Sequence, residues 1–184
     1  MTWDFIRFIF GHPRRSREAA EPGVDALQEM PVRIERMRLD DLDGVMEVEH
    51  LSYETPWSRR AFVSEVTENA YAHYFCAKQG AKVVGYIGMW LILDEAHITN
   101  VAVHPDFRSM GIGRMLMENA IGVTEAHGCP KITLEVRRHN LIAQSLYRSL
   151  GFQMAGVRKG YYTDNGEDAF IMVRDTQKPF SGED

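Results

Sequence analysis

The stretch Asn100-Val-Ala-Val-His-Pro-Asp-Phe-Arg-Ser-Met-Gly-Ile-Gly-Arg-Met-Leu116 joins a short strand pattern to a glycine-containing loop and the start of a helix. Val101 and Val103 alternate with smaller residues, as expected for a strand. Pro105 ends this strand, because proline cannot donate a hydrogen bond to a central ladder. The pattern therefore predicts a strand that leads directly into a loop and then into an amphipathic helix from about Ile112.

The loop contains two glycines, Gly111 and Gly113, which allow backbone N–H groups to turn into one concavity without side chains in the way. The unpaired N–H groups and the dipole of a helix N-terminus bind phosphate. Arg108 and Arg114 add positive charge on either side. We therefore predict a pyrophosphate-binding loop.

The loop departs from two well-known phosphate motifs. A dinucleotide fingerprint needs a third glycine where the sequence has Leu116, and a P-loop needs Lys-Ser/Thr where it has Arg114-Met115. The order of a Val-Ala-Val strand, a proline, Arg108, Gly111 and Gly113 instead resembles the acetyl-CoA loop of the GNAT N-acetyltransferases.

Composition is consistent with one globular domain that carries a sizeable core. The chain has 184 residues, 45% of them hydrophobic, and a net charge of -5 from 21 basic and 26 acidic side chains. This balance argues against non-specific nucleic-acid binding. Cys76 and Cys129 lie in apolar surroundings and are predicted to be buried, reduced thiols of a cytoplasmic protein. The seven histidines show no metal-ligand spacing, so no metal is predicted.

The sequence divides into three parts. Residues 1–30 form an extension and linker with a short apolar run from Trp3 to Phe10, residues 31–174 form the domain, and residues 175–184 form a polar tail. The apolar run is much shorter than the roughly 18 residues of a membrane span. Its basic residues follow it, unlike those of a secretory signal. Two interpretations of the extension are open. In the favoured one it packs on its own domain or stays mobile. In the other it forms a short helix that docks on a partner or on a membrane surface.

The domain reads as α/β (α+β), with a mixed, mostly antiparallel sheet flanked by helices. Strands are expected at Val32 to Ile34, Tyr74 to Lys78, Val83 to Leu93, His97 to Val103, Lys131 to Arg137, Phe152 to Tyr161 and Ala169 to Val173. Helices are expected after the N-caps Asp40, Ser58 and Asn140, and from Ile112 to His127. The helix after Asn140 is expected to bury a stripe of Ile142, Leu146 and Leu150.

A second group of polar residues follows the loop. Glu135 lies near the end of a strand, and Asn140 and Tyr147 are seven residues apart, which places them on one helix face. Taken singly, these residues read as an exposed strand glutamate, an N-cap and a surface tyrosine. Taken together, downstream of a phosphate loop, they predict a carboxylate, an amide and a phenol that face one tunnel.

These groups fit acetyl transfer from a thioester to an amine. Glu135 can accept the proton of the amine, directly or through water. A backbone N–H of the strand Val101 to Val103 can polarise the thioester carbonyl. Tyr147 can protonate the leaving thiolate. The phenol, with a pKa of about 10, is a weaker acid than a thiol, with a pKa of about 8.5. The proton is therefore transferred while negative charge develops on the sulfur. No nucleophilic side chain is required.

A wider set of motifs resembles the RimI family, the bacterial GNAT branch that acetylates the N-terminal alanine of a small-subunit ribosomal protein. The resemblance covers roughly residues 31–174. It rests on Pro56-Trp57-Ser58, Asp94-Glu95-Ala96, Asn100 to Val103, Leu134 to Arg137, Asn140, Leu146-Tyr147, Tyr161-Tyr162 and Gly166 to Ala169.

The resemblance implies Glu135 as general base and Tyr147 as general acid. It also implies acetyl-CoA contacts from Val101, Ala102, Val103, Ser109, Met110, Gly111, Ile112, Gly113, Arg114 and Asn140, to which the loop adds Arg108. Trp57, Tyr161 and Tyr162 are expected to wall a slot for a chain end. Glu95, with Asp94, Glu167 and Asp168, is expected to attract a basic substrate tail.

Two alternatives remain at this point. The first is a GNAT enzyme that acts on other protein N-termini, on a lysine side chain or on a small amine, because fold-level likeness does not fix the substrate. The second is a non-catalytic acetyl-CoA-binding module. The presence of both Glu135 and Tyr147 argues against the second, since a sensor needs only the loop.

Overall fold

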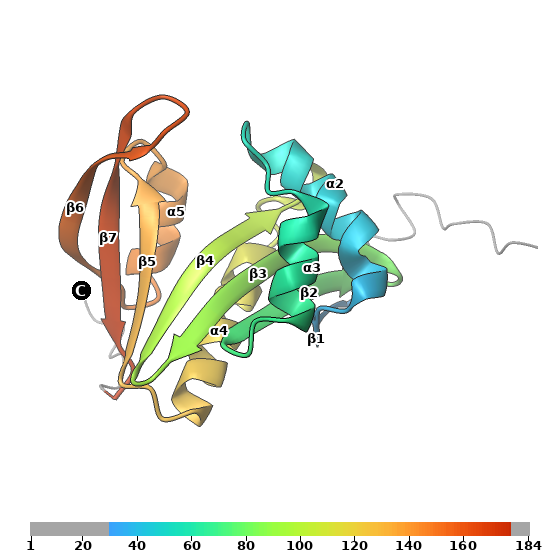
Figure 1. Cartoon of the computed structure of the whole chain (residues 1–184), viewed down its shortest axis with the longest axis horizontal. Coiled ribbons are helices and arrows are strands. Elements are labelled where there is room, and N and C mark those ends of the chain that lie inside the picture. Colours follow the sequence, from blue (N-terminus) through green and yellow to red (C-terminus); the bar gives the residue numbers. More distant parts are fainter. Residues whose placement is uncertain (1–29, 178–184) are drawn as a thin grey trace, which may run out of the picture.

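The structure, a computed structural model, describes residues 30–177 (Figure 1). The predicted extension up to residue 29 and the end of the polar tail lie outside the described residues. Within the described part there are four α-helices and two short 3₁₀ turns: η1 (Leu39–Asp41), α2 (Leu42–Ser52), α3 (Arg59–Thr67), η2 (Pro105–Phe107), α4 (Ile112–Ala126) and α5 (Leu141–Arg148). None of these helices is long and apolar enough to cross a membrane.

The strands form one sheet in the order β1-β2-β3-β4-β5-β7-β6. Their bounds are β1 (Val32–Arg36), β2 (Ala72–Gln79), β3 (Lys82–Ile92), β4 (Glu95–Val103), β5 (Lys131–Arg137), β6 (Gln153–Tyr162) and β7 (Glu167–Asp175). Neighbouring strands are antiparallel except for β4 and β5, which are parallel and are connected through α4. The predicted mixed, mostly antiparallel sheet flanked by helices is confirmed.

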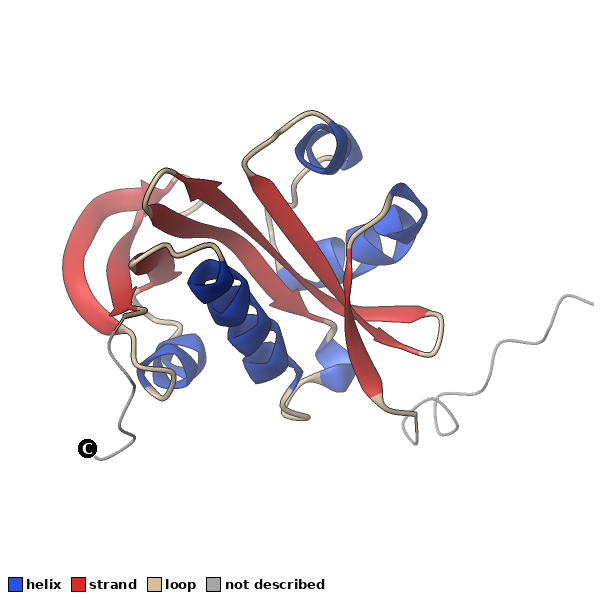
Figure 2. Cartoon of the chain, turned by 90° about the horizontal axis from the view of Figure 1, so that it is seen from below, coloured by secondary structure: helices blue, strands red, loops and turns tan. Residues whose placement is uncertain are grey.

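Helices cover both faces of the sheet (Figure 2). On one face α4 and α5 pack on a core that contains Ile87, Leu116 and Leu134. On the other face α2 and α3 enclose a second core, in which Phe62 packs edge-on against Tyr86 with ring centroids 5.5 Å apart. Fully burying one such side chain stabilises the fold by about 1.5–3 kcal/mol, so both layers hold the sheet in place.

The sheet carries a β-bulge in β4. Gly88 pairs with Asn100 while the next residue of β3 pairs with Ile98, so Thr99 is the extra residue. A Cβ on Gly88 would overlap the ring of Tyr74 and the side-chain oxygen of Asn100, which explains the glycine at this position. A bulge bends its strand and increases the local twist, and here it turns the second half of β4 away from β5.

Most predicted helix ends are confirmed, and one is wrong. The side chain of Ser58 accepts a hydrogen bond from the N–H of Ala61, and that of Asn140 accepts one from Ala143. Asp40 does not cap α2. It lies inside η1, and the neighbouring Asp41 instead accepts a hydrogen bond from the N–H of Arg38, so the chain enters α2 through a 3₁₀ turn.

The predicted apolar stripe of α5 is wrong at one of its three positions: Leu150 is buried and Leu146 packs on the core, but Ile142 does not. Ile142 is 87% exposed, whereas Gln144 and Tyr147 are the buried residues of the helix. Gln144 is buried because its side-chain amide donates to the carbonyl groups of Arg137 and Arg138 before the helix. These two hydrogen bonds turn Tyr147 toward the sheet. Cys76 and Cys129 are buried free thiols, as predicted.

Candidate active site

The parallel strands β4 and β5 pair over only half of their length. Their pairing runs from Glu95 with Lys131 to Ile98 with Leu134. Beyond Ile98, β4 stays with β3, and beyond Leu134, β5 stays with β7. Figure 1 shows the two strands meeting at one end and spreading apart at the other. The split leaves one edge of β4 without a strand partner.

Backbone groups of β4 point into this split. The carbonyl of Val101 accepts a hydrogen bond from Tyr53 Oη at 2.7 Å, and that of Val103 accepts one from Arg108 Nε at 3.1 Å. The N–H of His104 donates to Val84 of β3, on the other side. Because the N–H and C=O of one strand residue point the same way, the N–H groups of Val101 and Val103 face the split.

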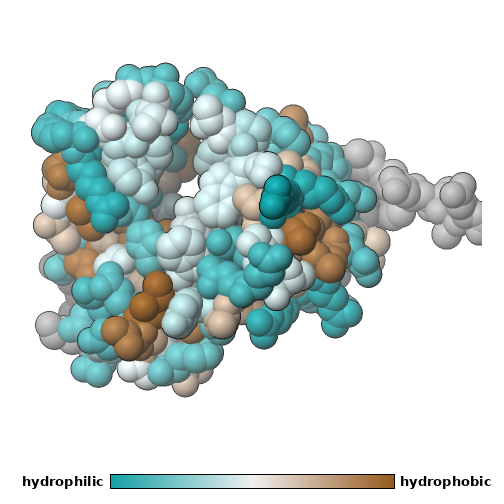
Figure 3. Space-filling view, viewed as in Figure 1, coloured by the Kyte–Doolittle hydropathy of each residue, from teal (hydrophilic) through white to brown (hydrophobic). Residues whose placement is uncertain are grey.

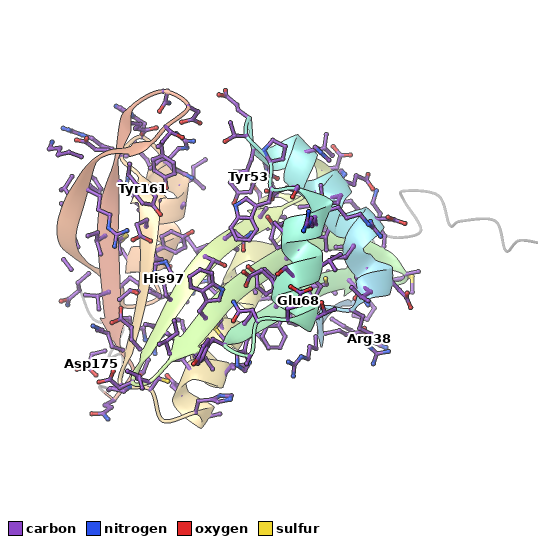
Figure 4. The ribbon with its side chains drawn as sticks, viewed as in Figure 1. Arg38, Tyr53, Glu68, His97, Tyr161 and Asp175 are labelled. Atoms are coloured by element: carbon purple, nitrogen blue, oxygen red, sulfur yellow. The ribbon has the colours of Figure 1, made fainter. Side chains whose placement is uncertain are left out.

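A cavity of about 350 Å³ opens on the split. Figure 3 shows the molecule hollowed between its two lobes at this place. One side, here called the β4 wall, consists of Glu49, Tyr53, Thr55, Trp57, Ile98, Thr99, Asn100 and Val101. The opposite side, the β5 wall, consists of Leu134, Glu135, Val136, Arg137, Tyr161 and Tyr162. Asn140 and Tyr147 line the cavity from α5. Figure 4 shows Tyr53 and Tyr161 on opposite sides of the split.

Glu135 is the ionisable group of the β5 wall that is best placed to accept a proton. Its side chain is 7% exposed, with Oε2 3.2 Å from His97 Nε2 and Oε1 3.0 Å from Arg158 Nη1. The Nδ1 of His97 lies 3.1 Å from Thr133 Oγ1, which fixes the ring. The side chain of His97 is 32% exposed, so this histidine connects the buried carboxylate of Glu135 to solvent.

Tyr147 lies on α5, which packs beside β5 (Figure 1), and it lines the same cavity as Glu135. Its ring packs on Phe152 at 6.0 Å between centroids, and burial raises the pKa of its phenol far above the ordinary value. The hydroxyl is not among the buried, unsatisfied atoms of the described residues, and no side chain or backbone group bonds it. It therefore opens into the cavity in its protonated form.

The predicted substrate residues are brought together except for Glu95. Trp57 lines the β4 wall, and Tyr161 and Tyr162 line the β5 wall with their rings edge to face at 5.2 Å. Burial raises the pKa of Tyr162 to about 12. Glu95 lies outside the cavity at the start of β4, where its carboxylate accepts from Thr133 and pairs with Lys131 at 2.7 Å.

Other acidic residues that were expected to attract a basic tail are also paired within the protein. Glu167 pairs with Arg137 at 3.3 Å, and Asp168 pairs with Lys159 at 2.7 Å. Neighbouring donors lower the pKa of both carboxyl groups. The backbone N–H of His139 has the largest effect on Glu167, and the side chain of Lys159 has the largest effect on Asp168. Their charges therefore organise the β6–β7 hairpin.

The predicted pyrophosphate loop has the backbone that the glycines indicate. Ser109 has φ 63° and Gly111, the N-cap of α4, has φ 80°. The first N–H groups of a helix have no intrahelical partner, so those of Ile112, Gly113 and Arg114 are available to an anion. The side chain of Ile112 is 1% exposed and belongs to the core, which leaves only its backbone for the ligand.

The two arginines of the loop both contact neighbouring parts of the protein. Arg108 donates to the carbonyl of Val103 and to Ser52, at 3.1 and 3.4 Å. Arg114 donates to Ser149 of α5 at 2.6 Å and lies 3.6 Å from Glu118. In this structure both guanidinium groups brace the loop against its neighbours. Within residues 30–177, no group of His, Cys, Asp or Glu could hold a metal ion.

The residues that line the cavity or contact Glu135 include several that were not predicted, among them Glu49, Tyr53, His97 and Arg158. Glu49 had a detectable signal, since it follows Val45 by four residues and so places a charge on the apolar face of a helix. His97 and Arg158 had none, because their proximity to Glu135 depends on strand pairing across the chain.

Comparison with known proteins identifies the class. The profile described as "Acetyltransferase (GNAT) family" matches residues 42–152. The ribosomal protein bS18-alanine N-acetyltransferase of Escherichia coli is 38% identical over 142 residues, which cover 76% of this chain and 95% of its own. A Bacillus subtilis relative named for the same reaction is 42% identical over 139 residues, 76% of this chain and 92% of its own.

Solved structures agree with these sequence matches. The crystal structure of the ribosomal-protein-S18-alanine N-acetyltransferase from Escherichia coli superposes with a TM-score of 0.74 at 33% identity, covering 84% of this chain and 99% of that one. The chain therefore belongs to the GNAT family of acetyltransferases, which use acetyl-CoA as acetyl donor. It is an acyl-transferring enzyme with the fold that the loop predicted.

Proposed function

We propose that this protein is a cytoplasmic peptide N-terminal alanine acetyltransferase that acts on the α-amine of a small-subunit ribosomal protein. The observation that carries the proposal is the convergence of Glu135, Tyr147 and the free edge of β4 on one cavity. The relatives named for bS18-alanine acetylation support it over nearly their whole length.

The chain offers acetyl-CoA two kinds of contact. The N-terminus of α4, with its positive-φ residues Ser109 and Gly111, suits the pyrophosphate. The N–H groups of Val101 and Val103 face the split and suit the amide-containing arm that leads to the thioester. Asn140 and Tyr147 line the same split from α5. Acetyl-CoA supplies the activated acetyl group.

The reaction needs no covalent enzyme intermediate. The amine nitrogen attacks the thioester carbon and loses a proton to Glu135, directly or through water. The N–H of Val101 stabilises the oxyanion. As the C–S bond breaks, Tyr147 donates its proton to the sulfur. Because burial raises the pKa of Tyr147, this transfer accompanies bond cleavage and does not precede it.

The chemistry favours an α-amine over a lysine side chain. Their ordinary pKa values, about 7.7–8.0 and about 10.4, differ by about 2.5 units, or roughly 3.4 kcal/mol in the free energy of deprotonation. A single carboxylate base therefore has much less to do for an α-amine. The aromatic side chains of Trp57, Tyr161 and Tyr162 wall a narrow entrance that suits a chain end.

The test is an acetylation assay with acetyl-CoA and a panel of peptides that differ only in their first residue, read by mass spectrometry. We expect the peptide that begins with alanine and carries basic residues further along to react fastest. Faster reaction of another first residue, or of a small amine, would assign the enzyme a different substrate. Binding of acetyl-CoA without any transfer would indicate a binding module.

A further inference from the structure

Two carboxylates border the cavity, and their surroundings differ. Glu135, on the β5 wall, takes part in ion pairs with Arg158 and His97. None of the ion pairs within residues 30–177 involves Glu49, on the β4 wall. The proposed acetylation uses Glu135 and leaves Glu49 without a task.

Glu49 is held only by neutral donors. It lies on the buried face of α2, and the residue is 2% exposed. Its Oε1 accepts from the N–H of Trp57 at 2.8 Å, and its Oε2 accepts from the hydroxyl of Tyr86. The amide of Asn100 in turn donates to that hydroxyl at 3.4 Å.

Such a site is incomplete on physical grounds. An ionised carboxylate offers about four acceptor positions, and two donors bond that of Glu49. A buried charge is costly unless a charge of opposite sign is brought to it. The residue lines the cavity beside the aromatic side chains of Tyr53 and Trp57, and aromatic faces also attract cations. The ligand that completes the site is therefore a small cation that enters with the substrate.

We propose that Glu49 is the binding subsite for the protonated α-amine of the substrate. This inference rests on the proposed function. A free N-terminus has a pKa of about 7.7–8.0 and arrives mostly as an ammonium at neutral pH. Glu49 holds that ammonium on the β4 wall until its first proton leaves to solvent, and Glu135 on the β5 wall accepts the proton that the neutral amine loses as it attacks. Binding and deprotonation are thus assigned to different carboxylates.

A purely structural role for Glu49 makes a different prediction. In that case the carboxylate only fixes the loop at Trp57 and the ring of Tyr86, and its charge has no effect on ligand preference. The two roles separate when charge and hydrogen bonding are changed independently. Glu49→Gln removes the charge and keeps an oxygen for the N–H of Trp57, whereas Tyr86→Phe removes a hydrogen bond and keeps the charge.

The experiment measures peptide affinity by calorimetry on full-length protein saturated with CoA. Two peptides are compared, one with a free N-terminal alanine and one in which a propionyl group replaces that residue and so lacks the amine. At about pH 6.5 we expect wild type to prefer the amine by about tenfold, and Glu49→Gln to lose this preference. Tyr86→Phe and Glu135→Gln are expected to retain it.

The pH dependence gives a test that needs no variant. The preference of wild type for the free amine is expected to fall as pH rises through about 8, where the amine becomes neutral. A preference that survives in Glu49→Gln, that is lost in Glu135→Gln, or that does not change with pH would overturn the proposal. CoA affinity, measured in parallel, shows that each variant is folded.

Failure of this inference is distinct from failure of the proposed function. Wild type is assayed for acetylation of the free-amine peptide at the same time. Normal transfer with no dependence of the amine preference on Glu49 rejects the subsite and leaves the function in place. Absence of both transfer and binding by wild type rejects the function and, with it, the subsite.

Discussion

The β4 wall and the β5 wall of the cavity use different chemistry. On the β4 wall, neutral donors bond the charged and polar groups: Tyr53 bonds the carbonyl of Val101, and Trp57 and Tyr86 bond Glu49. On the β5 wall the charges are paired, with Glu135 beside Arg158 and His97. The difference fits the proposed division of tasks, in which the β4 wall binds and polarises the reactants and the β5 wall accepts a proton.

The largest expected effect is at the base of the β5 wall. Glu135→Gln should lower turnover by about a hundredfold or more, most strongly at low pH, where more of the amine is protonated. Acetyl-CoA affinity should be nearly unchanged. Steady-state kinetics across pH, with calorimetry, measures both.

The matched control is Glu95→Gln, which changes a carboxylate on the neighbouring strand, outside the cavity and held by Lys131 and Thr133. It should leave turnover within about twofold, since surface ion pairs contribute little. Full turnover of Glu135→Gln at every pH would show that the base lies elsewhere.

The next effect concerns Tyr147, the proposed proton donor on α5. Tyr147→Phe removes a hydroxyl but keeps the ring contact with Phe152, so turnover should fall by about tenfold to a hundredfold while stability changes little. Because burial raises the pKa of Tyr147 above 10.0, the phenol stays protonated throughout the neutral and mildly alkaline range. The loss of wild-type turnover that its deprotonation causes should therefore begin only above pH 10. An alkaline limb near neutrality that disappears in Tyr147→Phe would contradict this assignment.

A smaller effect is expected at the loop that precedes α4. A Cβ on Gly111 would meet no atom within 4 Å, but its φ of +80° disfavours any side chain. Gly111→Ala should therefore weaken acetyl-CoA binding by about tenfold, corresponding to roughly 1–2 kcal/mol of backbone strain. Gly122→Ala is the control, because Gly122 lies inside the same helix and also has open space around it. Equal acetyl-CoA affinities for the two variants would remove the loop assignment.

The smallest effect is expected from Tyr53→Phe. It removes the 2.7 Å hydrogen bond to the carbonyl of Val101, which should cost about 1 kcal/mol of unfolding free energy and change turnover less than Glu135→Gln or Tyr147→Phe. Thermal unfolding measures the stability, with Tyr71→Phe, at a 57% exposed tyrosine, as the control. A loss of turnover as large as that of Glu135→Gln would move Tyr53 into the catalytic group.

Much of the fold could be predicted from local patterns. Alternating apolar residues located the strands, and hydroxyl or amide caps located the starts of α3 and α5. The two failures have non-local or competing causes. Asp41 bonds the N–H of Arg38, so α2 is not capped by Asp40, and hydrogen bonds from Gln144 to the preceding chain turn α5 so that Ile142 is exposed.

Prediction of the site also succeeded for residues close together in sequence and failed for residues that the fold brings together. Glu135, Asn140 and Tyr147 follow one another closely in sequence, and their spacing was enough to predict a shared tunnel. Glu49 reaches the cavity from α2, and His97 contacts Glu135 from β4, so their positions depend on which elements the fold brings together. Glu95 shows the opposite error: it belongs to a recognisable motif, but its partners Lys131 and Thr133 keep it outside the cavity.

The measurement that tests the central claim most directly uses one peptide in two forms. The peptide begins with alanine, carries internal lysines, and is supplied with its N-terminus either free or already blocked. Mass spectrometry locates the acetyl group after reaction with acetyl-CoA. We predict transfer only to the free α-amine and no reaction of the blocked form. Acetylation of the blocked peptide at a comparable rate would contradict the account and identify a lysine-directed enzyme.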